Sequence, residues 1–416
     1  MPSDAVETDA LSTAFAEHWP RLVADLARRH ADLELAEDAV ADAFAEALRT
    51  WRTSVPGNPG GWLRTAARRR AVDRIRAQEA SGRRERAVAR PEDEPDDHAG
   101  PGHDPVRDQL ALLFGCCHPC LPQESQVALT LRSVNGLTTA DIARLFLTSA
   151  DTMTRRLHRA RAKLRAYAVP FRVPEPDQWP ERLAPVLQAV YLTFTAGYSS
   201  ESHDTTFVRG DLCDEARWLA QLLAAAAPDD PEIAGLLALM DFTDARRRAR
   251  VAPDGSTVTL EDQDRSLWDR AAMESGRTRL RAALRQRRIG PFQAQAALSA
   301  CHAMAPTWQE TNWAEIISWY DVLLAVDPSS VHALNRAVAL TLGGRAAEAL
   351  AAIDGVSEEL ADYPYLWVAR AEALERLGRS AEALEAVARA DAAGLHPSQE
   401  KHLHRRVERL RGVRSP

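Results

Sequence analysis

The chain has 416 residues, of which 45% are hydrophobic, which is enough for roughly two to four domains with cores of their own. No stretch approaches the roughly 18 uncharged apolar residues of a membrane-spanning helix, the N-terminal segment lacks a secretory signal, and five cysteines do not make a disulfide framework. We therefore expect a cytoplasmic protein without membrane contact. The formal net charge is −7, but basic residues are concentrated in two short segments.

The first expected domain, residues 1–78, is helical. In residues 33–48 apolar side chains recur at helical spacing, and acidic side chains cover the rest of that helix. After a turn-rich loop, Asn58 can cap a helix whose first residue is Pro59. That helix, residues 59–78, carries the first basic patch, because residues 64–90 contain ten arginines and three acidic residues.

Residues 79–108 have almost no large apolar side chain, and residues 92–108 hold seven acidic residues and one arginine. Such a segment cannot bury enough surface to become ordered. We expect an acidic flexible linker here. It separates two basic patches, an arrangement that suggests two contacts with nucleic acid on one chain.

Residues 109–168 are expected to contain a helix-turn-helix. Thr138 can cap its first helix with Asp141 as capping-box partner, and Ser149 can cap the second helix after a three-residue turn. One side of the second helix is an apolar stripe of Met153, Leu157, Ala160 and Leu164. Away from this stripe lie the candidate DNA-binding residues Thr152, Thr154, Arg155, Arg156, His158 and Arg159. Such a helix suits the major groove, where arginine binds guanine edges or phosphate; the alternative is a solvated basic surface.

Residues 169–416 begin with a proline-rich connector and are expected to form a helical extension. GRAAEALAAI at 344–353 returns as GRSAEALEAV at 378–387, an offset of 34 residues, which is the tetratricopeptide period. We expect such repeats over about 313–390, with a looser helix pair near 291–304 and 313–326. Repeats of this kind usually bind a peptide or protein ligand; the alternative is that they only complete a helical domain.

No catalytic or metal site stands out in the sequence. Cys117, His118 and Cys120 suggest zinc, but the adjacent Cys116 and Cys117 are better explained as small apolar groups in a helix. We expect no enzymatic activity, no metal and no cofactor.

Three segments resemble sigma-70 family RNA polymerase sigma factors of the extracytoplasmic-function type. They are DLELAEDAVADAFAEAL (32–48), NPGGWLRTAARRRAVDRIR (58–76) and LTLRSVNGLTTADIARLFLTSADTMTRRLHRARAKL (129–164). LLALMDFTDARRRAR and ALNRAVAL resemble the subgroup with a C-terminal tetratricopeptide-like extension. The resemblance implies an all-α fold: a region 2 helical bundle, a flexible linker, the region 4 helix-turn-helix and a C-terminal helical domain with repeats.

The resemblance also implies promoter-specific transcription initiation, with core RNA polymerase and promoter DNA as partners and the extension as a regulator. Polymerase would be bound by acidic residues of the first segment, namely Asp32, Glu34, Glu37, Asp38 and Asp42. We expect Glu37 and Asp38 on the polar side of their helix, far from the basic patches. Region 2 would contact minus-ten DNA through Asn58, Arg64, Arg68, Arg69 and Arg74, and region 4 would bind the minus-thirty-five element. Two other interpretations remain: a conventional helix-turn-helix regulator that binds DNA by itself, and a tetratricopeptide scaffold without DNA binding.

Overall fold

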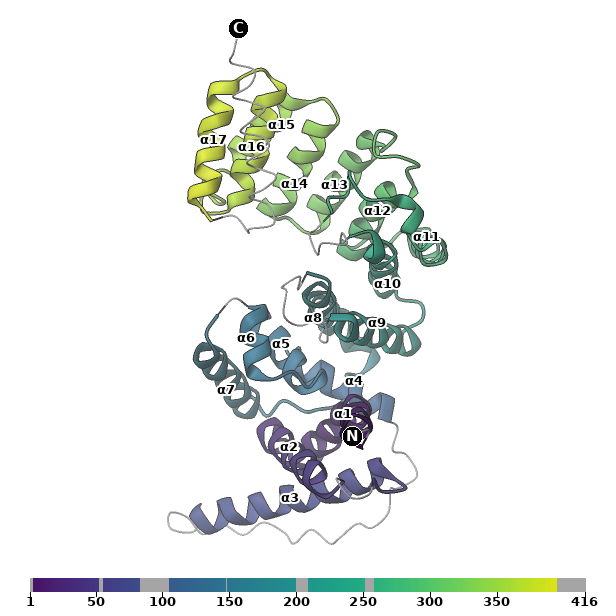
Figure 1. Ribbon diagram of the computed structural model, residues 1–416, viewed down its shortest axis with the longest axis vertical. Coiled ribbons are helices and arrows are strands. Elements are labelled where there is room, and N and C mark those ends of the chain that lie inside the picture. Colours follow the sequence, from purple (N-terminus) through teal and green to yellow (C-terminus); the bar gives the residue numbers. More distant parts are fainter. Residues whose placement is uncertain are drawn as a thin grey trace. The chain divides into compact units, whose positions relative to one another are not determined.

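A computed structural model describes residues 3–51, 55–82, 105–146, 148–199, 209–250 and 258–394. Within these residues the chain is helical and has no strand, which confirms the expected all-α class. The chain divides into two compact units, Met1–Leu223 and Ala224–Pro416 (Figure 1). None of the described helices is long and apolar enough to cross a membrane.

Three helices form the first part of unit 1: α1 (Ser3–His30), α2 (Leu33–Thr50) and α3 (Pro59–Gly82) (Figure 1). The side chain of Asp32 caps α2, accepting hydrogen bonds from the backbone N–H groups of Glu34 and Leu35. Asn58 caps α3 by accepting a hydrogen bond from the backbone N–H of Gly61 at 2.9 Å. These caps satisfy backbone donors that a helix start leaves without partners, so α2 and α3 begin where the sequence predicts.

The expected linker is shorter than predicted at both of its ends. Helix α3 continues to Gly82, four residues beyond the predicted end of that helix at residue 78, and the next helix already begins at Pro105. The rest of the expected linker, residues 83–104, lies outside the described residues.

The second part of unit 1 contains the helix-turn-helix. Its helices are α4 (Pro105–Cys116), α5 (Gln123–Leu129), the π-helical turn η1 (Thr130–Val134), α6 (Thr139–Leu145), α7 (Ala150–Ala166), the 3-10 turn η2 (Pro176–Gln178), α8 (Trp179–Ser199) and α9 (Arg209–Ala226). Thr138 and Asp141 form the predicted capping box on α6, and Ser149 caps α7. All four residues of the predicted apolar stripe of α7 are buried. The local prediction of this motif is therefore confirmed.

Helix α8 follows the proline-rich connector but packs against α4 and α5, within unit 1. The Trp179 ring meets the Phe114 ring edge-on, with centroids 5.1 Å apart. A guanidinium nitrogen of Arg182 donates a hydrogen bond of 2.8 Å to the backbone oxygen of Phe114. The first helix of the expected extension therefore completes the compact unit that holds the helix-turn-helix, and the division between the units falls within α9.

Unit 2 is built from paired helices. They are α10 (Pro231–Asp244), α11 (Arg270–Arg285), α12 (Pro291–Met304), α13 (Trp313–Val326), α14 (Ser330–Leu342), α15 (Ala346–Val356), α16 (Pro364–Arg376) and α17 (Ser380–Ala392), with the short 3-10 turns η3 (Arg247–Ala249) and η4 (Arg265–Leu267). Helices α12 and α13 coincide with the looser helix pair that the sequence predicts.

The repeated sequence forms two equivalent helical hairpins, α14–α15 and α16–α17. Their first helices begin at Ser330 and Pro364, and their second helices at Ala346 and Ser380, so both starts are 34 residues apart. The turns contain Gly344 and Gly378 at φ values of 80° and 72°, a conformation that favours glycine. The alanines at 337, 349, 371 and 383 are fully buried, which lets the paired helices approach closely.

Candidate nucleic-acid interface

The outer side of α7 presents two exposed arginines, Arg155 and Arg159. Arg155 donates a 3.3 Å hydrogen bond to the hydroxyl oxygen of Thr152, and Nε of Arg159 donates to the backbone oxygen of Arg155 at 3.3 Å. Within the described residues these contacts stay inside α7. Both guanidinium groups therefore lie at the surface, opposite the buried stripe, where a nucleic acid can reach them.

The other candidate residues of α7 differ in their surroundings. Thr154 and His158 are exposed, and the Thr154 hydroxyl donates to the backbone oxygen of Ala150 at 2.8 Å. Arg156 instead pairs with Glu124 at 2.9 Å, and its guanidinium carbon lies 5.5 Å from the centre of the Phe146 ring. Arg156 thus connects α7 to α5 and to the end of α6, so its contacts are structural in this conformation.

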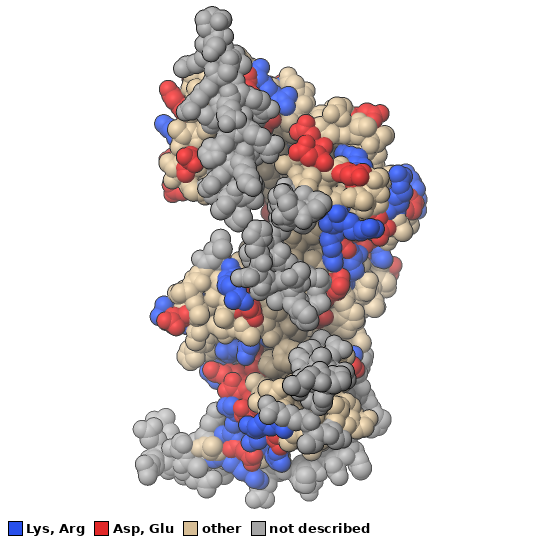
Figure 2. Space-filling model, viewed as in Figure 1, with Lys and Arg blue, Asp and Glu red and all other residues tan. Residues whose placement is uncertain are grey.

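Four arginines of the basic helix α3 pair with acids of α1 and α2. Arg68 lies 3.1 Å from Asp25, Arg69 lies 2.7 Å from Glu46, and Arg70 lies 2.8 Å from the same carboxylate. Arg74 bridges two acids, Asp38 at 2.9 Å and Asp42 at 2.8 Å. Figure 2 shows the resulting surface of α2 and α3, on which blue and red side chains alternate.

These pairs change the acidity of the carboxylates. Hydrogen bonds from Arg69 and Arg70 lower the pKa of Glu46. Burial raises the pKa of Asp25, but the contacts with Arg29 and Arg68 outweigh burial and leave the pKa below its usual value. Both carboxylates are therefore held in the charged form, which strengthens the link of α3 to α1 and α2.

Asn58 and Arg64, two of the residues predicted to contact DNA, border a hollow of about 220 Å³ between α1 and the start of α3. The hollow is lined by His18, Arg21, Leu22, Asp25, Asn58, Gly60, Gly61 and Arg64. A Cβ atom on Gly60 would stand 2.8 Å from the His18 ring, so glycine allows this close approach. The hollow is small, and it brings together side chains, among them Arg21, Asn58 and Arg64, that can bind a phosphate or the edge of a base.

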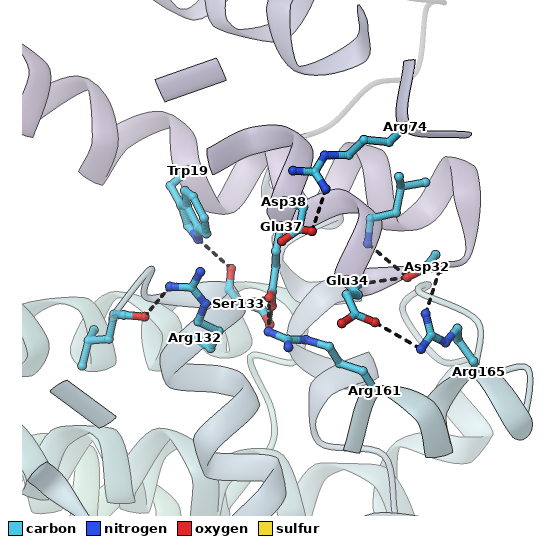
Figure 3. A network of polar contacts seen from close by, with 12 residues as sticks. Trp19, Asp32, Glu34, Glu37, Asp38, Arg74, Arg132, Ser133, Arg161 and Arg165 are labelled. Carbon is cyan, nitrogen blue, oxygen red and sulfur yellow. Dashed lines mark hydrogen bonds and ion pairs between the residues drawn. The ribbon is translucent and has the colours of Figure 1, made fainter. Parts of the chain in front are cut away.

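The five acidic residues predicted to bind polymerase all have arginine partners in this structure. Figure 3 shows four of them, Asp32, Glu34, Glu37 and Asp38. Asp38 and Asp42 contact Arg74 of α3. Asp32 and Glu34 both contact Arg165 of α7, each at 3.1 Å. Burial lowers the pKa of Arg165, but the bonds with Asp32 and Glu34 outweigh it and raise the pKa above its usual value.

The expectation that Glu37 and Asp38 lie on an exposed polar side far from the basic patches is wrong. Asp38 is exposed, but it pairs with Arg74 of the basic helix α3, and Glu37 is buried. Its side chain is only 2% exposed, and its carboxylate accepts hydrogen bonds from the Ser133 hydroxyl and from Arg161 of α7. Nε of Arg132 lies 3.8 Å away. Burial raises the pKa of Glu37, and Arg161, Ser133 and Arg132 oppose this rise only in part.

A sequence signal for this burial exists. Glu37 follows Leu33 by four residues and precedes Val40 by three, so it falls on the apolar stripe of α2 that also buries Phe44. An acidic residue on an apolar stripe needs a partner when the stripe is covered. The burial of Glu37 could thus be predicted from the sequence. Its partners Ser133 and Arg161 could not, because no sequence pattern around either residue indicates a contact with Glu37.

The cysteine-rich segment is packed as a structural element. Cys116 and Cys117 are fully buried in and beside α4, and burial raises the pKa of Cys117 to about 12. The backbone N–H of Cys120 donates to Nδ1 of His118 at 3.1 Å. No three His, Cys, Asp or Glu side chains of the described residues are grouped so as to hold a metal ion.

Three known protein families match separate parts of the chain. Residues 15–81 match sigma-70 region 2, residues 111–164 match sigma-70 region 4, and residues 182–284 match a family of unknown function (DUF6596). The last match begins within α8 and extends into unit 2.

Two kinds of relatives are found. An uncharacterized protein of Rhizobium meliloti (strain 1021), R00370, is 37% identical over 415 residues, which are 97% of this chain and 96% of that protein. The ECF RNA polymerase sigma factor SigK of Mycobacterium ulcerans (strain Agy99) is 30% identical over 169 residues, 38% of this chain and 86% of that protein. SigK of Mycobacterium sp. (strain KMS) is 28% identical over 162 residues, 36% of this chain and 79% of that protein. No solved structure matches the chain.

Proposed function

Because the chain belongs to the sigma-70 family of RNA polymerase sigma factors and is related to its ECF group, we propose that it directs initiation at promoters through two DNA contacts and one polymerase contact. It is a transcription initiation factor and not an enzyme, with core RNA polymerase and promoter DNA as partners. The observation that carries the residue assignments is the outer face of α7, where Arg155 and Arg159 are exposed opposite a buried apolar stripe.

Helix α7 would enter the major groove of the minus-thirty-five element. The start of α3 would contact the minus-ten element, where Asn58 and Arg64 border a small hollow. The acidic side of α2 would bind core polymerase. In this assignment the basic helices α3 and α7 contact DNA and the acidic helix α2 contacts protein. Carboxylates repel phosphates, so the acidic helix is not expected to lie against DNA.

Transcription with purified components tests this proposal. The full chain and core RNA polymerase are incubated with a pool of randomised double-stranded DNA, retained fragments are sequenced, and run-off transcription is measured on the enriched fragments. A sigma factor selects DNA only together with polymerase, and enriched fragments start transcription at one position. Selective DNA binding without polymerase would instead support a conventional regulator, and no DNA binding in either case would support a scaffold.

We further propose that the extension, residues 169–416, regulates the sigma domains and that its tetratricopeptide-like repeats bind a peptide or protein ligand. The 34-residue offset of the two hairpins and their buried alanine contacts support the repeat assignment. Truncation after residue 227 keeps α8 and α9 in place on unit 1. A rise in run-off transcription means that unit 2 inhibits, a loss means that it is required, and an unchanged output contradicts a regulatory role.

A further inference from the structure

We propose that helix α11 of unit 2 provides a third contact with DNA, one that binds the phosphate backbone of the double helix without regard to sequence. This contact goes beyond the two promoter contacts of the proposed function, and it rests on that function only because the function places the chain on DNA. The groups that would bind phosphate are arginines on one side of α11 and in the turn that follows it.

Charge is distributed very unevenly within unit 2. Residues 270–288, which are α11 and the turn after it, hold seven arginines and one acidic residue, a net charge of +6. Residues 291–394 hold 14 acidic residues and six arginines, a net charge of −8. Figure 2 shows blue side chains gathered near α10 and α11. The segment around α11 is therefore a basic surface beside acidic repeats, which phosphates would avoid.

Three arginines form a row along α11. Arg277, Arg281 and Arg285 follow one another at intervals of four residues, so they lie on successive turns, about 6 Å apart along the helix axis. Leu280 and Ala283, on another side of the helix, are buried where α11 packs on α10 and α12. Packing of the apolar side thus leaves a regular row of guanidinium groups, the arginine row, at the surface.

The arginines in and after this row differ from those of the repeat hairpins in their partners. Arg281, Arg285 and Arg287 are exposed, and within the described part of the chain none of them forms an ion pair with a carboxylate. In the hairpins, by contrast, Arg345 and Arg379 each lie 2.6 Å from a glutamate three residues further along the chain. Phosphate can therefore bind the arginines of α11 without displacing a carboxylate.

The turn after α11 holds an arginine in a backbone conformation that favours glycine. Arg287 has a φ value of 55°, in the left-handed region that commonly follows the end of a helix. Its side chain is exposed, so burial of that side chain does not offset the strain. Arg288 follows, and its guanidinium donates a hydrogen bond of 3.3 Å to the backbone oxygen of Asp229. A cation kept at a strained, exposed position indicates a role in binding.

The outer surface of α11 suits a phosphate backbone better than it suits a protein. Between the arginines, exposed positions carry short side chains such as Ala271, Thr278 and Ala282. No exposed position of α11, a helix that is described along its whole length, holds an aromatic or large aliphatic side chain. Side chains of that kind dominate the energy of protein interfaces, whereas DNA interfaces are polar and rich in positive charge.

A groove beside the arginine row is the feature that a protein partner would use. It has a volume of about 430 Å³, and Arg277, Arg281 and the half-exposed Met304 are among the residues that line it. Arg285 and Arg287 do not line the groove. The basic surface therefore continues beyond the groove, as expected for a long ligand with regularly repeated negative charges.

DNA binding by the full chain, without polymerase, tests the contact directly. Anisotropy of a fluorescently labelled duplex of random sequence is measured over a range of salt concentrations. The row variant, Arg281→Ala with Arg285→Ala and Arg287→Gly, should bind severalfold more weakly at low salt. The slope of the logarithm of the binding constant against that of salt should become shallower by about 2 to 3 units, because each lost phosphate contact removes about 0.9 unit. Glycine suits the backbone at position 287, so the midpoint of thermal unfolding should stay near the wild-type value.

A matched control makes the same change in net charge within unit 2. Arg345→Ala with Arg376→Ala and Arg379→Ala removes three exposed arginines that already pair with carboxylates, and it should keep the salt dependence of the wild type. Equal slopes for the wild type and the row variant would overturn the contact. Equal losses in the row variant and the control would also overturn it, because net charge alone would then explain the effect.

Run-off transcription with core polymerase separates this contact from the function on which it rests. On a cognate promoter the row variant should lose activity at a lower salt concentration than the wild type and the control. If it loses activity while its DNA binding is unchanged, the arginine row binds a protein and the proposed DNA contact is wrong. If its salt profile of transcription matches the wild type, the row is not used on promoters, which overturns the proposal. If no chain starts transcription, the proposed function fails, while anisotropy still reports whether α11 binds DNA.

Discussion

The two basic helices, α3 and α7, differ in what their arginines contact. On α3, Arg68, Arg69 and Arg74 each lie within about 3 Å of a carboxylate of α1 or α2. On the outer side of α7, Arg155 and Arg159 contact only groups of α7 within the described chain. To reach Arg68, Arg69 or Arg74, DNA must therefore displace carboxylates, whereas on α7 it meets guanidinium groups that are already exposed.

This difference shows that a count of basic residues does not measure a DNA-binding surface. Both helices carry clusters of arginine, but the arginines of α3 also connect that helix to α1 and α2. A substitution on α3 therefore combines a change in DNA binding with a change in packing. A substitution on the outer face of α7 should change DNA binding with little effect on stability.

The largest effect is expected from Arg155→Ala combined with Arg159→Ala. Loss of a good base contact costs about 1–3 kcal/mol, so the pair should sharply reduce run-off transcription from a cognate promoter. The midpoint of thermal unfolding should stay near the wild-type value, because both side chains are exposed. Normal transcription by the double variant would show that the exposed arginines are not the DNA-reading groups.

Asp25→Ala should have the next largest effect, on stability. Asp25 is buried and paired with Arg28, Arg29 and Arg68, so we expect a loss of about 2 kcal/mol in the free energy of unfolding, as for hydrogen bonds to charged groups. The lowered pKa of Asp25 means that its contribution is present above the usual carboxylate pKa and is lost as the pH falls through the folded-state value. Urea unfolding at neutral and acidic pH should therefore show a difference from wild type that shrinks in acid.

Glu17→Ala is the matched control on the same helix. Its carboxylate is 55% exposed and lies 4.0 Å from Arg21, and an exposed pair of this kind contributes little to stability. If Glu17→Ala destabilised the chain as much as Asp25→Ala, the arginine pairs around Asp25 would not be what holds α1 and α3 together.

Ser149→Ala should cost about 1 kcal/mol, the usual value for a lost helix cap. The Ser149 hydroxyl accepts a hydrogen bond from the backbone N–H of Thr152 at 3.2 Å, at the end of α7 that carries Arg155. Urea unfolding measures the loss of stability, and Ser149→Asp, which keeps a capping oxygen, should restore most of it. An alanine variant as stable as the wild type would mean that the cap does not fix the start of α7.

The smallest effect is expected from Arg74→Ala. Its guanidinium already binds Asp38 and Asp42, so replacing it removes one potential phosphate contact together with two partly exposed ion pairs worth little each. The salt dependence of DNA binding by the holoenzyme should become shallower by at most about one unit of slope. A loss of binding as large as that of the α7 double variant would mean that Arg74 exchanges its acids for DNA.

Local sequence determined the helices and their starts. Thr138 with Asp141, Ser149, Asp32 and Asn58 all cap helices, and the apolar stripe of α7 is buried as its spacing predicts. The 34-residue repeat likewise predicted two equivalent hairpins. These features depend on residues within one or two helical turns, or on a repeated pattern, and both can be found in one sequence.

Only the tertiary structure decided which charges are exposed. Glu37 accepts hydrogen bonds from Ser133 and Arg161, which are 96 and 124 residues away in the chain. Arg69 and Arg74 likewise form ion pairs with acids of α2. Helix α8 packs against α4 and α5, although a proline-rich connector precedes it. Coulombic and packing contacts act through space, so a pattern confined to one helix indicates which residues can pair but not which partner reaches them.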